Sequence, residues 1–154
     1  MPEFIETPDG KRYVHEINAR FGGPEAQVDM RYMKSDLLEM CVAALTGTLA
    51  KTPLEMHPIY SIGVNTAHTG HAEKTGSGKR ITGVDVANKQ EGVKVFMNSV
   101  DIVDGDVFTN GGRPLTVTAV ASSLDEARKR VYEALELIYY DGIDYRHDIG
   151  LRQM

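Results

Sequence analysis

A strand pattern that stops at a Gly-Gly-Pro turn constrains this chain more than any other feature. Residues 13–18 read Y-V-H-E-I-N, and the Gly-Gly-Pro turn follows at residues 22–24. Because side chains alternate between the two faces of a strand, Glu16 and Asn18 are predicted to emerge on one face, about 7 Å apart. A carboxylate and an amide carbonyl are hard oxygen ligands of the kind that Mg²⁺ takes. The pattern favours a divalent-ion site, although an edge strand also carries polar residues on its solvent face.

The continuation of this strand resembles a known catalytic motif. Residues 16–27 read E-I-N-A-R-F-G-G-P-E-A-Q, which closely resembles the last catalytic motif of the phosphoribosylamine–glycine ligases, usually E-[FY]-N-x-R-F-G-D-P-E-T-Q. These enzymes, also called glycinamide ribonucleotide synthetases, are ATP-grasp ligases of purine biosynthesis. Gly23 and Ala26 replace an Asp and a Thr of the usual motif, and neither offers a side-chain hydrogen bond. These departures bear on amino-acid substrate binding more than on metal binding, and Glu25 and Gln27 are expected to shape the turn.

Further blocks of the same family appear in order along the chain. Residues 35–39 (S-D-L-L-E) resemble a helix start, and parts of residues 73–83 (E-K, then I-T-G) resemble a loop of the family. Residues 109–119 (T-N-G-G-R-P-L-T-V-T-A) are similar to the family's T-x-G-G-R-V-L-x-V-T-A segment. The closing helix at residues 125–134 and the ending Y-R-H-D-I-G-L-R at residues 145–152 complete the set. The resemblance therefore covers nearly the whole chain.

The resemblance implies a reaction and a role for four residues. In the family, ATP phosphorylates the glycine carboxylate, and the nitrogen of 5-phosphoribosylamine attacks the acyl phosphate to give glycinamide ribonucleotide, ADP and phosphate. Carried over to this chain, Glu16 and Asn18 hold Mg²⁺ or Mn²⁺. Arg20 is the implied catalytic residue and contacts the phosphates of ATP or the acyl phosphate, which a planar guanidinium matches well. Arg113 lies on the domain that closes over the cleft, so a phosphate-binding or interdomain role is implied for it.

The family's enzymes are much longer than this chain. Their lysine-bearing lid, adenine pocket and amino-terminal domain have no counterpart in these 154 residues. We therefore expect the carboxyl-terminal part of such a ligase, as a cloned fragment or the product of a split or shortened gene. Alone it is expected to be catalytically silent, because a metal-ligand pair without a nucleotide pocket cannot orient reactants. The alternative is a non-catalytic remnant, an assembly module that docks on a separate amino-terminal subunit.

The residue pattern predicts an α+β chain in two parts. Residues 1–57 are expected to be the end of an ATP-grasp domain, with a hairpin of strands at 3–6 and 13–18 and a helix over 35–46. Residues 58–154 are expected to form a small antiparallel β-rich carboxyl-terminal domain covered by a helix.

Local signals refine these elements. Ser35 is the expected N-cap of the first helix, and Cys41 lies on its expected buried face. Ser123 begins a capping box ahead of an apolar stripe that continues to Ile138 and ends before Gly142. Short strands bounded by turn residues are predicted at residues 59–66, 81–82, 93–98, 106–109 and 115–121.

Composition excludes several classes of function. A net charge of −5 and a pI near 5.5 argue against nucleic-acid binding, which depends on a basic footprint. No apolar run approaches the ~20 residues that span a bilayer, and the first residues lack the basic and apolar regions of a secretion signal. The single cysteine permits no internal disulfide, which fits a reducing compartment. The expectation is a cytoplasmic protein with no membrane or nucleic-acid partner.

Three short patterns superficially resemble ligand-binding motifs. Residues 76–80 (G-S-G-K-R) lack the spacing of a phosphate-binding loop and are interpreted as a surface turn. His68 and His71 offer two imidazoles where zinc takes three or four ligands, so they are expected to be surface histidines. Residues 101–106 hold three aspartates but lack the ligand order and terminal Glu of a calcium loop, so a solvated turn is expected.

Overall fold

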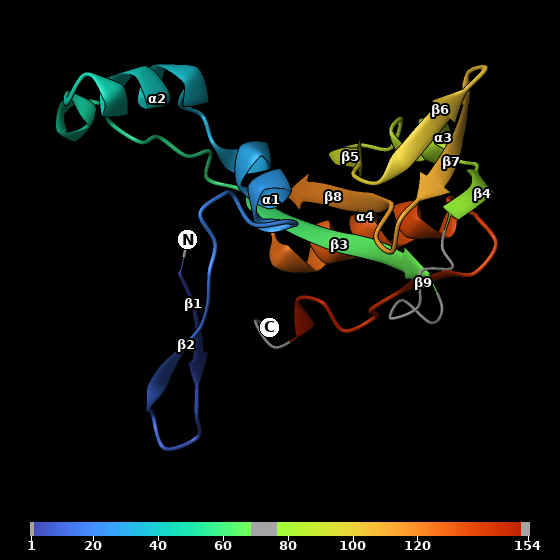
Figure 1. The fold of residues 1–154 in the computed structure, drawn as a ribbon, viewed down its shortest axis with the longest axis horizontal. Coiled ribbons are helices and arrows are strands. Elements are labelled where there is room, and N and C mark those ends of the chain that lie inside the picture. Colours follow the sequence, from blue (N-terminus) through green and yellow to red (C-terminus); the bar gives the residue numbers. More distant parts are fainter. Residues whose placement is uncertain (1, 69–76, 152–154) are drawn as a thin grey trace.

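The computed structural model describes residues 2–68 and 77–151, and its first part is an extended appendage (Figure 1). The chain starts with an antiparallel hairpin of β1 (Pro2–Glu6) and β2 (Arg12–Ile17). Helices α1 (Glu25–Tyr32) and α2 (Leu37–Leu45) and a 3-10 turn η1 (Leu49–Lys51) follow. The hairpin and α2 extend away from the rest of the molecule in different directions (Figure 1). All six residues of β2 are exposed, so this hairpin has no sheet beneath it among the described residues.

A four-stranded antiparallel sheet forms the centre of the molecule. Its strands lie in the order β5-β8-β3-β9. Their bounds are β3 (Tyr60–His68), β5 (Val93–Met97), β8 (Leu115–Ala121) and β9 (Ile143–Tyr145). The long strand β3 therefore pairs with β8 on one side and with β9 on the other.

Two helices cover opposite faces of this sheet. Every second residue of β3 from Ile62 onward is buried, and Ile62 and Val64 join the hydrophobic core that α4 (Leu124–Glu136) completes. On the other face, Ser61 Oγ donates a hydrogen bond of 3.0 Å to the carbonyl oxygen of Val28 in α1. Gly63 also lies against α1, because a Cβ there would lie 2.7 Å from Cγ2 of Val28. The sheet is thus enclosed between α1 and α4.

The hydrophobic core lies between the sheet and α4. Helix α4 begins at Ser123, whose hydroxyl accepts a hydrogen bond from the Glu126 backbone N–H at 3.3 Å, and this bond satisfies one of the free donors of the first turn. Its buried residues repeat at helical spacing, as a helix packed on a sheet requires: Ala127, Val131, Ala134 and Leu135. Tyr140, just after the helix, is fully buried and donates its hydroxyl to the carbonyl of Ala67 at 2.9 Å.

A smaller antiparallel sheet lies beside the first. Its strands are β4 (Ser77–Ile81), β6 (Val100–Val103) and β7 (Asp106–Asn110), in the order β4-β7-β6. A short helix α3 (Val84–Ala87) follows β4 and begins at Gly83. Backbone hydrogen bonds between Thr82 and Tyr139 of 2.9 and 3.1 Å tie this region to the end of α4. None of the helices in the described part of the chain is long and apolar enough to cross a membrane.

Much of the predicted architecture is confirmed. The protein is α+β with antiparallel sheets and a covering helix, and Ser123 caps that helix as predicted. The hairpin and the strands predicted at 93–98 and 115–121 appear within one or two residues of their expected bounds. The division of the chain after residue 57 stays a prediction.

Several details of the prediction are wrong. Asp36, not Ser35, caps α2, because its side chain accepts hydrogen bonds from the N–H groups of Leu38 and Glu39. Cys41 is exposed, and Ala43 is the buried residue of α2 among the described residues. The prediction also lacked α1, β6 and β9. The apolar face of α2 is present in the sequence, but Leu38, Val42 and Leu45 on this face are more than half exposed.

Candidate functional site

The end of the hairpin brings acidic and amide side chains together. Pairing of β1 with β2 aligns Glu3 with Glu16 and Phe4 with Val14, so His15 is an extra residue that forms a β-bulge. Just beyond β2, the Asn18 side-chain amide donates a hydrogen bond of 3.1 Å to Glu3 Oε1. Glu16 is exposed and Asn18 is half-buried. The hairpin therefore presents these side chains beside the turn that leads to α1.

A cleft of about 340 Å³ contains all four residues that the resemblance singled out. Glu16, Asn18 and Arg20 line it from the hairpin side, and Arg113 lines it from the loop that precedes β8. Glu3 and residues 22–25 complete its wall. The fold thus brings Arg113 to the same space as the hairpin residues, although it lies far from them in the sequence.

A larger cleft of about 590 Å³ adjoins the first and shares Arg20, Gly23 and Arg113 with it. It lies on the α1 side of the central sheet. Among the described residues, the others that line it are uncharged and polar, and none carries a carboxylate: Gln27, Asn65, Asn98, Ser99 and Thr116. Arg20 and Arg113 supply the charges among these described lining residues, which favours a negatively charged ligand in the larger cleft.

A chain of side-chain hydrogen bonds forms the floor of the larger cleft. Gln27 in α1 donates to Asn98 Oδ1 at 3.2 Å, and Asn98 Nδ2 donates to Thr116 Oγ1 at 2.8 Å. Thr116 Oγ1 in turn donates to Asn65 Oδ1 at 2.6 Å. Because these residues come from a helix, a turn and two strands, the network fixes the geometry of the cleft.

The smaller cleft holds charges of both signs. Glu3, Glu16 and Glu25 supply carboxylates, and Arg20 and Arg113 supply guanidinium groups. Arg20 is held by a hydrogen bond of 2.7 Å from its Nη1 to the carbonyl oxygen of Phe21. The carboxylates can attract a cation and the guanidinium groups an anion, which is the combination that a metal-bound phosphate needs.

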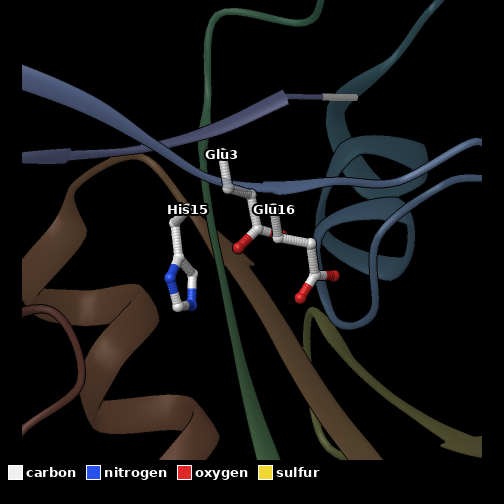
Figure 2. Close-up of side chains that lie close together, drawn as sticks. All are labelled: Glu3, His15 and Glu16. Carbon is white, nitrogen blue, oxygen red and sulfur yellow. The ribbon is translucent and has the colours of Figure 1, made fainter.

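Sequence reasoning missed several residues of this region. Glu3 and His15 lie beside Glu16, and their ligand atoms and that of Glu16 all lie within 4.8 Å of one another (Figure 2). Regular alternation along a strand predicts that the side chains of His15 and Glu16 point to opposite faces. The β-bulge places both side chains on one face instead. Gln27 was expected to shape a turn, but it lies in α1 and begins the hydrogen-bond network.

The other candidate patterns have structural roles. His68 is 7% exposed and packs beside the ring of Tyr140, so the expectation of a surface histidine is wrong for it. The interpretation of residues 76–80 as a surface turn is wrong for residues 77–80, which belong to strand β4. His71 and Gly76 lie outside the described residues. Residues 101–106 belong to the β6–β7 hairpin, where Asp106 pairs with Arg80 at 2.6 Å. These residues do not extend the cleft.

Comparison with known proteins identifies the family. Residues 61–152 match the family model "Phosphoribosylglycinamide synthetase, C domain". The phosphoribosylamine–glycine ligase of Vibrio parahaemolyticus is 42% identical over 144 residues, which are 94% of this chain and 33% of that protein. The corresponding ligase of Rhodopirellula baltica is 41% identical over 145 residues, again 94% of this chain and 33% of that protein.

Two solved structures share the fold. The phosphoribosylamine–glycine ligase of Thermotoga maritima matches with a TM-score of 0.67 and 30% identity, over 91% of this chain and 34% of that one. The N5-carboxyaminoimidazole ribonucleotide synthetase of the same organism matches with a TM-score of 0.59 and 19% identity, over 90% of this chain and 36% of that one, which is a likeness of fold alone. The chain spans about a third of the length of the curated relatives it matches. It belongs to the phosphoribosylglycinamide synthetase family and corresponds to the carboxyl-terminal portion of its members.

Proposed function

We propose that this chain is the carboxyl-terminal part of a phosphoribosylamine–glycine ligase and supplies one wall of its active site. The complete enzyme would join glycine to 5-phosphoribosylamine at the expense of ATP. The observation that supports this proposal most is the shared cleft of Glu16, Asn18, Arg20 and Arg113. The proposal includes the division of the chain into an ATP-grasp end, residues 1–57, and a carboxyl-terminal domain, residues 58–154.

The donor set of the cleft fits Mg²⁺ or Mn²⁺. Glu16 offers a carboxylate and Asn18 an amide carbonyl, and such ions take one or two oxygen ligands of this kind beside water and substrate phosphates. A bound ion would neutralise phosphate oxygens as charge develops during phosphoryl transfer. The hydrogen bond from Asn18 to Glu3 restricts the amide and so helps to orient it.

Arg20 and Arg113 are proposed to bind the phosphate groups. Both line the smaller and the larger cleft, and both are exposed and able to reach a ligand. A guanidinium can form two parallel hydrogen bonds to phosphate oxygens, which positions the group as well as attracting it. Arg20, two residues from Asn18, is the group proposed to steady the phosphate of ATP or the acyl phosphate next to the metal.

A second candidate function, assembly on a separate amino-terminal subunit, is favoured by the exposed apolar side chains of the first 57 residues. On the hairpin, Phe4 pairs with Val14 and Ile5 with Tyr13, and exposed apolar side chains that lie together mark an interaction site. In both candidate functions, the rest of a ligase covers these apolar side chains. The two functions differ in whether the assembled active site catalyses the reaction. The large apolar side chains that are at least half exposed in this part are Phe4, Ile5, Tyr13, Val14, Ile17, Phe21, Leu38, Val42, Leu45 and Leu54.

A chimaeric ligase tests the catalytic proposal. This chain would replace the matching carboxyl-terminal third of the Vibrio parahaemolyticus ligase, and ADP release would be measured with and without glycine and phosphoribosylamine. We expect substrate-dependent ADP release from the chimaera and none from the chain alone, because one wall of the proposed site is not enough to orient the reactants. A folded, monodisperse chimaera without that activity would overturn the catalytic proposal and leave the assembly role.

A further inference from the structure

The β-bulge at the end of the hairpin creates a cluster of three metal-ligating side chains. Glu3 belongs to β1, and His15 and Glu16 are consecutive residues of β2. In a regular strand His15 and Glu16 would point to opposite faces. Because both lie opposite Glu3 in the bulged register, they share one face. Figure 2 shows the three side chains leaving the hairpin on the same side.

The three side chains are close enough to share one ion. One carboxylate oxygen of Glu3, one of Glu16 and one imidazole nitrogen of His15 all lie within 4.8 Å of one another. Ligands around an ion at 2.0–2.2 Å lie at most about 4.4 Å apart, so small side-chain rotations suffice to reach coordination distance. His15 and Glu16 are exposed and Glu3 is half-buried, so an ion can enter and keep water in its open positions.

The charges of the cluster also favour a cation. Two carboxylates lie close together, and within residues 2–68 and 77–151 neither forms an ion pair with a lysine or arginine. Like charges at this separation repel one another, and a divalent ion removes that repulsion. The amide of Asn18 donates to Glu3 Oε1 at 3.1 Å, and a second-layer hydrogen bond of this kind orients a ligating carboxylate.

We propose that Glu3, His15 and Glu16 form a site for a first-row transition-metal ion such as Zn²⁺. An imidazole nitrogen is a ligand that Zn²⁺ and its neighbours accept and that Mg²⁺ rarely takes. This ligand set is therefore distinct from the oxygen pair of Glu16 and Asn18, although Glu16 belongs to both. A transition-metal ion bound by the cluster uses the Glu16 carboxylate, which the proposed magnesium site also requires.

Zinc titration of the full chain tests this site without any ligase activity. Calorimetry with Zn²⁺ in a non-chelating buffer would compare the unaltered chain, His15→Ala and the matched control His57→Ala, which changes another exposed histidine. We expect one strong site in the unaltered chain and in the control. Loss of His15 is expected to weaken Zn²⁺ binding about 100-fold. Mutation of a residue that only hydrogen-bonds to a metal ligand already lowers metal affinity about 10- to 100-fold.

Cobalt gives a second readout of the same ligand set. Co²⁺ substitutes for Zn²⁺, and its visible absorption reports the number and type of ligands. The unaltered chain should show a spectrum that His15→Ala loses and His57→Ala keeps. Equal Zn²⁺ affinity in all three proteins, or no binding by the unaltered chain, would overturn the proposal. Neither result would bear on the chimaeric ligase assay, which uses Mg²⁺ and ATP.

Discussion

Glu16→Ala in the chimaeric ligase is expected to lower kcat on the order of 100-fold or more. Glu16 is the carboxylate of the proposed metal site, and without it the ion would be held by one amide oxygen and the phosphates. Stability should change little, because the side chain is exposed. Steady-state kinetics at saturating ATP, glycine and Mg²⁺ measure the effect, and Glu133→Ala on the exposed face of α4 serves as the control.

Substitution of Asn18, the second proposed metal ligand, makes this test more specific. If Glu16 and Asn18 act on the same ion, the losses caused by Glu16→Ala and Asn18→Ala should not add in the double variant. A chimaera in which Glu16→Ala retains kcat within about threefold of the parent would refute the metal role. Purely additive losses would instead indicate that the two residues act independently.

Gly83→Ala is expected to destabilise the fold by about 3 kcal/mol or more, because among the described glycines an added Cβ would meet its closest neighbour at this position. Gly83 begins α3 with a φ of +84°, and a Cβ there would overlap the backbone carbonyl oxygen of Leu137. The backbone of Leu137 cannot move aside as a flexible side chain can. The added Cβ would therefore force apart the contact between the smaller sheet and the end of α4. Urea denaturation followed by circular dichroism measures the loss.

Gly105→Ala is the matched control for this prediction. Gly105 has a similar φ of +87°, but a Cβ there would meet no atom within 4 Å. Its substitution should cost only the left-handed backbone penalty of about 1–2 kcal/mol. The difference between the two variants isolates the close approach to Leu137. Equal free energies of unfolding would show that this approach does not hold the two parts together.

The sequence predicted those parts of the fold that carry strong local signals. The alternating strand at β8 and the Ser123 cap of α4 are read directly from neighbouring residues, and both were correct. Helix α1 was missed because Pro24 precedes it and no side chain caps its first turn. The apolar pattern of residues 35–46 correctly predicted the helix α2, but its prediction of a buried face was wrong. A hydrophobic pattern does not say which other element covers the apolar face.

The candidate site was predictable only in part. The motif around Glu16 singled out three residues of the smaller cleft, and resemblance added Arg113, whose position depends on tertiary packing. Glu3 and His15 could not be found, because a β-bulge depends on the pairing of β1 with β2 and not on a residue pattern. The hydrogen-bond network from Gln27 to Asn65 likewise joins residues distant in sequence.

A crystal structure of the chimaeric ligase with Mn²⁺ and a non-hydrolysable ATP analogue would show which residues hold the metal ion. The anomalous signal of Mn²⁺ would locate the ion without assumptions about its ligands. We predict an ion bound to the nucleotide phosphates, with a Glu16 carboxylate oxygen and Asn18 Oδ1 at about 2.0–2.3 Å from it and with Arg20 and Arg113 facing the phosphates. An ion held by other residues, with Glu16 and Asn18 both beyond coordination distance, would contradict this prediction.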